Sequence, residues 1–419
     1  MKKACRAALT LLALVLCCIL ANFAATFIDT PRLRANAAQG VAMLGEQGAT
    51  PELTGGFKSS QPDNYTSVLI LKTAAYTGAE SRLMRTFGGF RTDMPTPEGG
   101  DAWTAFCTYA DGTESPTGGL SYSRYWHGYI LPLRILLCFF NTANIQMLLL
   151  ALQGLLCGCL LLLLQKRRVL RLAPGFFAAF FVMMPSVTGL CLQYAPVTLL
   201  MLTSCCLLLA AEDRIRSFFG FPAFFAAVGL MTSYLDLLTF PMITISFPLA
   251  MLIALQLDEG RSGTALLKDS VLCILAWGIG FAGMWAFKWL LNMLVFGSGY
   301  TGGIAGQIAL RMSSSSHGTS YSRLGMLLRN FNVILAKSSY LLILLLAGLA
   351  SLAASLRRGR PDPRALLLLL PAGIPIVWML LTTNHIYDHT YYTYRNIAGF
   401  LFSCFALLSC LIKSRKTEK

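Results

Sequence analysis

The stretch NIQMLLLALQGLLCGCLLLLLQKRR, residues 144–168, contains the pattern that decides the fold. It carries no charge from 144 to 164 and ends in the basic run Lys166, Arg167 and Arg168. A helix of about 20 apolar residues crosses a hydrocarbon core about 30 Å thick with all its backbone hydrogen bonds satisfied internally. The stretch therefore predicts a transmembrane helix that ends at a basic loop.

The same pattern recurs along the chain. Of its 419 residues, 55% are hydrophobic and 13% charged, and long apolar runs alternate with short polar segments. We therefore expect an all-α integral membrane protein with about ten transmembrane helices. The expected spans are 1–27, 144–164, 172–189, 197–211, 218–235, 239–257, 271–296, 331–355, a ninth ending near 383 and a tenth beginning near 395.

The net charge of +15 would suggest a nucleic-acid partner in a soluble protein. Here, however, Lys and Arg concentrate in short loops at alternate ends of the apolar runs, as in 166–168, 357–364 and 413–416. Such loops stay in the cytoplasm in multi-span proteins. The pattern predicts both termini in the cytoplasm, membrane lipid as a partner and no nucleic acid.

Three parts are expected along the chain. Residues 1–27 form the first transmembrane helix, read as a signal anchor, with a cleaved signal peptide as the competing interpretation. Residues 28–128 are polar and rich in Gly and Pro, and form a large extracytoplasmic segment between the first and second spans. Residues 129–419 form a multi-span helical bundle.

Polar and ionisable residues gather in three clusters near the expected outer face. These are SYSRYWHGY (121–129), SYLDLLTFP (233–241) and NHIYDHTYYTYR (384–395). Ionisable groups inside a membrane bundle are costly and usually face a shared interior or cavity. We therefore expect the three clusters to converge around one outward-facing cavity.

Asp236 is the main candidate in the second cluster. A carboxylate buried there requires a cation, a metal or a proton. The expected partners are Arg124, Arg134 and Arg395, because a guanidinium satisfies a carboxylate in a fixed two-pronged geometry. The competing interpretation is a structural cap at a helix break before Pro241.

In the third cluster, His385, Asp388 and His389 are spaced by three and four residues. On a helix they would share one face and could hold a divalent metal ion. Tyr and His are also common in the interfacial belt of membrane proteins, which is the alternative explanation.

The first cluster holds Arg124, Tyr125, Trp126 and His127. One interpretation is an aromatic anchor that needs no ligand. The other is an Arg/His pair that grips a phosphate or pyrophosphate while the aromatic rings contact sugar or lipid. Both remain open at this stage.

The three clusters resemble motifs of a family of uncharacterised bacterial multi-span membrane proteins. The architecture, with a long outer segment after the first span, also resembles the GT-C class of glycosyltransferases, which use polyprenyl-phosphate-sugar donors. The resemblance implies a multi-pass protein of the bacterial plasma membrane. It also implies an acidic residue at the outer end of the first span, a place that Asp29 in ATFIDTPR occupies.

The leading functional hypothesis is a membrane glycosyltransferase that moves a sugar from a lipid-phosphate donor to an acceptor at the outer surface. Asp29 or Asp236 would be the catalytic base, and cations would hold the departing phosphate. The alternatives are a multi-span transporter and a non-catalytic factor of envelope polysaccharide assembly. The residues expected to bind substrate are Arg124, Tyr125, Trp126, His127, Tyr234, Asn384, His385, Asp388, His389, Tyr394 and Arg395.

Overall fold

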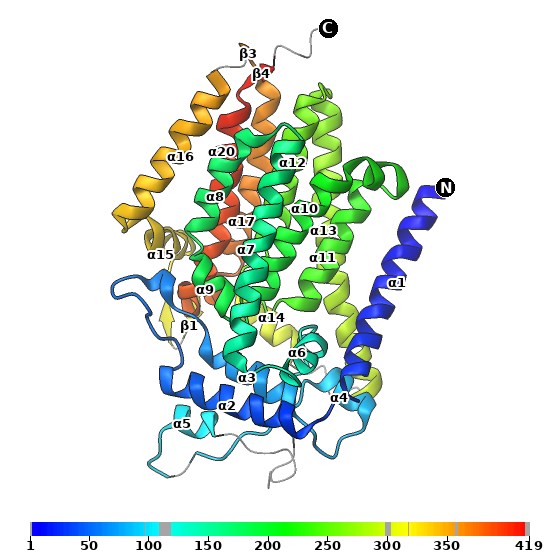
Figure 1. The fold of residues 1–419 in the computed structure, drawn as a ribbon, viewed down its shortest axis with the longest axis vertical. Helices are drawn as coiled ribbons and strands as arrows, with labels where there is room; N and C mark the ends of the chain where they lie inside the picture. The colour runs from blue at the N-terminus through cyan, green and yellow to red at the C-terminus, as the bar shows by residue number, and fades with distance from the viewer. Residues whose placement is uncertain are drawn as a thin grey trace.

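The computed structural model describes residues 2–96, 98–108, 119–297, 303–316, 318–356 and 359–414. Helices account for nearly all of its regular structure (Figure 1). Long helices run alongside one another in a bundle, and a layer of short helices closes one end of it. The start of the first helix, at residue 2, lies away from that layer.

Within the described part of the chain, six helical segments are long and apolar enough to cross a membrane. They are α1 (Lys2–Ala25), α7 (Thr142–Lys166), α10 (Ala195–Phe218), α13 (Gly263–Phe296), α16 (Ser338–Leu356) and the segment Pro363–Leu381, which joins η4 (Pro363–Leu368) to α17 (Leu369–Leu381). Shorter apolar helices pack among them, namely α8 (Ala173–Phe181), α11 (Phe221–Leu235), α12 (Ile243–Asp258) and α20 (Ile397–Cys410). The expectation of a helical protein with apolar helices of spanning length is confirmed.

Apolar side chains on the bundle surface agree with this reading. Leu9, Leu12 and Leu16 on α1 and Leu155 and Leu162 on α7 are all exposed. A water-soluble protein rarely exposes such contiguous apolar faces, whereas lipid tails solvate them.

Two expected spans are interrupted in the structure. The span 172–189 is interrupted after Phe181, because Met184 adopts a positive φ of 60° and Pro185 begins a separate helix, α9 (Pro185–Leu190). The span 331–355 is divided between α15 (Arg323–Leu335) and α16. α15 carries polar residues on one face and packs as a short amphipathic helix, so only the following apolar run forms a long helix.

Ion pairs join several loops at the end of the bundle near the C-terminus. Arg167 pairs with Glu212, and Arg216 pairs with Glu212 at 2.5 Å and with Glu259 at 2.6 Å. At the same end, β3 (Gly359–Pro361) pairs with β4 (Ile412–Ser414), close to the C-terminus (Figure 1). Most of the expected basic loops therefore meet at one end, although Arg357, Arg358, Arg415 and Lys416 lie outside the described residues.

The opposite end is covered by the segment that follows α1. Its helices are α2 (Pro31–Gln47), η1 (Lys58–Ser60), α3 (Asn64–Ala75), α4 (Arg82–Gly88) and α5 (Ala102–Cys107), followed by α6 (Ile130–Leu137). Leu33 and Val68 from this layer share one apolar cluster with Ile145 of α7 and with Leu237. The layer is thus packed directly on the bundle.

The remaining short elements lie at the same end as this layer (Figure 1). They are α14 (Ile304–Met312), β1 (Ser315–Ser316), β2 (Thr319–Ser320), α18 (Thr383–Asp388), α19 (Thr390–Thr393) and η5 (Tyr394–Asn396). Together with the loop after α11, they contribute most of the residues described next.

Candidate functional site

The three polar clusters come together at this end of the bundle. The Gly128 amide donates to the Tyr234 carbonyl at 2.9 Å, which joins the first cluster to the second. Nε2 of His385 lies 2.7 Å from the Leu238 carbonyl, which joins the second cluster to the third. Residues more than 250 positions apart in sequence thus form one polar region, as expected from the cost of isolated polar groups in lipid.

Asp236 follows α11 directly and is buried. Its carboxylate accepts hydrogen bonds from the amide of Thr239, at 3.0 and 3.1 Å, and from the Thr239 hydroxyl. The bend that places these donors includes Leu238, whose φ is 65°. Burial raises the pKa of Asp236 to about 7, and the hydrogen bonds from Thr239 oppose that rise.

The expected cation partners of Asp236 are mostly engaged elsewhere. Arg134 donates to the carbonyls of Ala25 and Tyr76, and Arg395 donates to three other carbonyls. Asp236 is stabilised by local hydrogen bonds and a raised pKa in place of a direct salt bridge to either arginine. That part of the sequence-based expectation is wrong, because both guanidiniums satisfy helix-end and loop carbonyls that would otherwise be buried without donors.

Arg395 is fully buried, and its guanidinium donates hydrogen bonds to backbone carbonyls of three segments. Its Nε donates to Met183 O, one terminal nitrogen to Tyr391 O and the other to Ser59 O, each at 2.9 Å. The guanidinium also lies 4.6 Å from the centre of the Tyr194 ring. Arg395 thus joins η1, the end of α8 and α19, and this arrangement gives no support to its predicted contact with a substrate phosphate.

His127 is likewise satisfied inside the protein. Nε2 lies 2.7 Å from the Tyr122 carbonyl, so it carries the proton, and Nδ1 accepts from the Tyr129 hydroxyl at 2.7 Å. Burial lowers the pKa of His127 to about 3, so the ring is neutral. The Arg/His phosphate grip expected here has no support, since a neutral ring with both nitrogens engaged attracts no anion.

Other aromatic residues of the clusters are anchors. Nε1 of Trp126 donates to Met284 O at 2.8 Å. The Tyr234 hydroxyl donates to Asn22 Oδ1 on α1 at 2.9 Å, and the Tyr394 hydroxyl donates to Val182 O at 3.2 Å. These contacts favour the structural interpretation for the three residues.

His385 and His389 face a cation that the sequence analysis did not identify. One terminal nitrogen of Arg311, on α14, lies 3.1 Å from His385 Nδ1 and 3.5 Å from His389 Nε2. Burial and the Arg311 charge lower the pKa of His389 to about 4, and burial lowers that of His385 well below its usual value. Both rings are neutral and direct lone pairs at Arg311.

This arrangement does not fit the expected metal site. α18 ends at Asp388, which is exposed, and His389 has left the helical conformation. The guanidinium of Arg311 occupies the position between the two imidazoles where a cation would bind. Among the described residues, no group of three His, Cys, Asp or Glu side chains is arranged to hold a metal ion.

α14 contributes a second residue to the cluster. Gln307 Oε1 accepts from Arg124 at 2.7 Å, and Gln307 lies four residues before Arg311, on the same helix face. Arg124 in turn lies over the Tyr122 ring. The spacing of Gln307 and Arg311 in an otherwise apolar nine-residue helix is the sequence signal that could have identified them.

Tyr125 connects these cations to Asp236. Burial raises the pKa of the Tyr125 hydroxyl, the charges of Arg311 and Arg124 lower it, and the charge of Asp236 raises it. Tyr125 therefore lies within electrostatic range of one carboxylate and two cations.

Asn384 and Asp63 extend the cluster towards its edges. The Asn384 amide donates to Ser315 O at 3.1 Å, and its buried Oδ1 has no hydrogen-bond partner within the described part of the chain. Asp63 begins α3 by accepting from the Thr66 amide at 2.8 Å, and Tyr391 donates to it at 3.3 Å. Asp63 was not identified from the sequence, where it resembles an ordinary loop residue.

Asp29 lies at the end of α1 and is exposed. Its carboxylate forms an ion pair with Arg34, one turn into α2. These contacts are local, so its expected role as catalytic base remains a prediction.

The Arg311→Gln variant is expected to raise the pKa of His389 above about 4, by up to about one to two units, because removal of a nearby positive charge favours the protonated ring. Burial is the larger cause of the shift, so the pKa should stay below its usual value. Titration of histidine-labelled protein by NMR measures it. Arg329→Gln, which removes an exposed cation over Tyr387, should leave it unchanged. An unchanged value in Arg311→Gln would contradict the described contact.

Comparisons of the chain with models of known protein families, with curated proteins and with solved structures found no match. The functional argument therefore depends on the geometry of the site.

Proposed function

We propose that this protein is a multi-pass membrane glycosyltransferase that moves a sugar from a lipid-phosphate-linked donor to an acceptor hydroxyl on the extracytoplasmic side. The observation that carries the proposal is the buried carboxylate of Asp236, with a pKa of about 7, in a cluster that also contains Arg124 and Arg311. A base with a pKa near the working pH and cations near the leaving group are what this transfer requires.

In the proposed topology the chain crosses the membrane ten times with both termini in the cytoplasm. α8, α11, α12 and α20 cross beside the six longer segments, and the layer of α2–α6 lies outside. What supports this orientation is the grouping of the basic segment 165–171 with the charged segments 212–216, at the end of α10, and 258–261 at the opposite end from that layer, where ion pairs join them. A bacterial plasma membrane is the proposed location.

Cysteine labelling tests this orientation. In a background without native cysteines, a cysteine at position 360 is expected to resist a membrane-impermeant maleimide in intact cells and to react after permeabilisation. A cysteine at exposed position 52, in the layer, is expected to react in intact cells. Labelling of position 360 from outside would reject the proposed topology.

In the proposed reaction, the acceptor hydroxyl gives its proton to the Asp236 carboxylate as its oxygen bonds to the anomeric carbon. The bond from that carbon to the donor phosphate breaks, and the lipid phosphate leaves with the electron pair. Arg124 and Arg311 stabilise the negative charge that develops on it. Asp29 is the second candidate for the base, and its geometry supports it less well, because it is exposed and its carboxylate is paired with Arg34.

Access to Asp236 is proposed to depend on α14. None of the residues described in this helix is fully buried, and its polar contacts with the cluster run through Gln307 and Arg311. Elements with few buried contacts open at low cost in free energy. Movement of α14 would expose the cluster to donor and acceptor.

The direct test is a transfer assay with purified protein, a panel of polyprenyl-phosphate sugars and acceptor glycans. Release of lipid phosphate together with a glycosylated product is the expected result. Uptake of a solute into proteoliposomes with no transfer from any donor would favour the transporter alternative. The position of the ionisable cluster at one end of the bundle supports the transferase over a transporter, whose sites usually lie near the middle of the membrane.

A further inference from the structure

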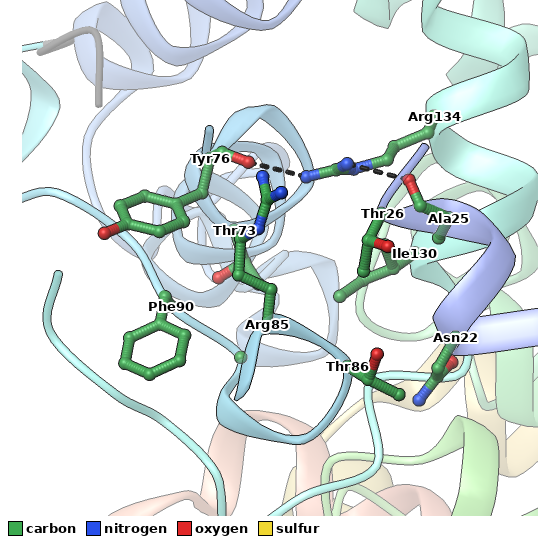
Figure 2. Close-up of a pocket in the computed structure, with 11 residues that line it drawn as sticks. Asn22, Ala25, Thr26, Thr73, Tyr76, Arg85, Thr86, Phe90, Ile130 and Arg134 are labelled. Atoms are coloured by element: carbon green, nitrogen blue, oxygen red, sulfur yellow. Dashed lines mark hydrogen bonds between the residues drawn. The ribbon is translucent and has the colours of Figure 1, made fainter. Parts of the chain in front are cut away.

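A small pocket lies at the C-terminal end of α1, apart from the histidine cluster (Figure 2). It has a volume of about 20 Å³, is partly open, and is lined by residues of α1, α3, α4 and α6 and of the loops that follow α1, α3 and α4. Its polar lining includes Thr26, Thr73, Thr86, Arg85 and Arg134. Among the described residues that line it, none is acidic.

Arg134 provides a fixed positive charge in the wall of this pocket. It is buried, and its terminal nitrogens donate to Ala25 O at 2.8 Å and Tyr76 O at 2.7 Å, as drawn in Figure 2. These carbonyls end α1 and α3, where the helix dipoles favour a cation. The guanidinium is therefore held in place whether or not the pocket is occupied.

Arg85, from α4, points into the same pocket (Figure 2). Its Nε is buried and, within the described part of the chain, has no hydrogen-bond partner. The hydroxyl of Thr73 is also buried without a hydrogen-bond partner among the described residues, and Thr73 as a whole is only 3% exposed. Buried polar groups without partners are costly, and two guanidiniums around one small pocket repel each other. Both costs are removed by an anion with several acceptor oxygens.

We infer that this pocket binds a phosphate group. Phosphate oxygens match the planar donor fork of arginine and also accept from threonine hydroxyls. The volume of about 20 Å³ has room for about one water-sized group, so it admits one phosphate oxygen, while the other oxygens and the rest of the ligand lie at the opening. Because Leu20 and Phe23 on the adjacent part of α1 and Phe27 just after it are exposed, the favoured source of the phosphate is a phospholipid whose chains lie along α1.

Binding measurements on the full chain in detergent test this site independently of any sugar transfer. The probes are a short-chain phosphatidylglycerol and inorganic phosphate. Arg85→Gln is expected to weaken phosphatidylglycerol binding by roughly 10- to 100-fold, because it removes a charged donor. Thr73→Val, nearly equal in shape, should weaken it by a smaller factor.

Arg82→Gln is the matched control. Arg82 lies on the same helix but packs over the Phe27 ring at 4.4 Å and is not part of the pocket, so binding should persist. Without ligand, Arg85→Gln should unfold at or above the wild-type temperature, since it removes repulsion with Arg134; a purely structural role would lower that temperature. Arg85-dependent binding of inorganic phosphate alone would assign the site to the free ion. Wild-type affinity of Arg85→Gln for both probes would overturn the inference.

Discussion

Asp236→Asn is expected to lower sugar transfer by roughly 100-fold or more while donor binding is largely retained. The substitution keeps the size of the side chain and can still accept from Thr239, so the bend around Leu238 should persist. It removes the group that takes the acceptor proton. Turnover and donor affinity, measured separately on the purified variant, check the result.

The wild-type pH profile gives a second readout for Asp236. A general base works in its deprotonated form, so kcat/KM should rise with pH and level off above a pKa of about 7. Asp236→Asn should abolish that rise along with the activity.

Asp29→Asn is the matched comparison, because both variants remove one carboxylate by the same change. Full activity in Asp29→Asn with loss in Asp236→Asn assigns the base to Asp236. The reverse result assigns it to Asp29. Normal transfer by both variants would reject the acid–base mechanism and strengthen the transporter or assembly-factor alternatives.

The helical architecture could be predicted because it depends on a local property. Apolar runs such as 144–164 are long enough to form helices of spanning length wherever they occur, and the structure has α7 at that position. The meeting of the three polar clusters was also predictable in general terms, because lipid penalises separate polar sites. Neither argument requires knowledge of which helices touch.

The individual roles of the polar residues depend on contacts between distant segments, which the sequence does not encode locally. The guanidinium of Arg395 is a group that commonly binds phosphate, yet it donates to Ser59 O and Met183 O, which are far away in sequence. Arg311 and Arg85 looked like ordinary loop cations, yet they face a histidine pair and a polar pocket. Buried carbonyls at helix ends also need donors and attract cations, and their positions appear only in the folded chain.

Arg395→Met is expected to destabilise the protein by roughly 3–5 kcal/mol, a large part of the typical stability of a folded protein. Methionine has a similar length and fills part of the volume, but the carbonyls of Ser59, Met183 and Tyr391 would lose buried donors. The hydrogen bonds that hold η1, the end of α8 and α19 together would be lost as a result. Arg395→Lys should be intermediate, since one ammonium cannot reproduce the geometry of the three hydrogen bonds.

Thermal unfolding in detergent, followed by tryptophan fluorescence, measures this effect, with Arg329→Met as the control. Arg329 is exposed and contacts the Tyr387 ring, so its loss should change the unfolding temperature little. If Arg395→Met unfolds at the wild-type temperature but loses donor binding, Arg395 is a ligand of the substrate and the structural role is wrong. If Arg395→Met loses stability and Arg329→Met does not, the buried cation acts by joining the outer layer to the bundle. Arg124 and Arg311 are then the cations available to a donor phosphate.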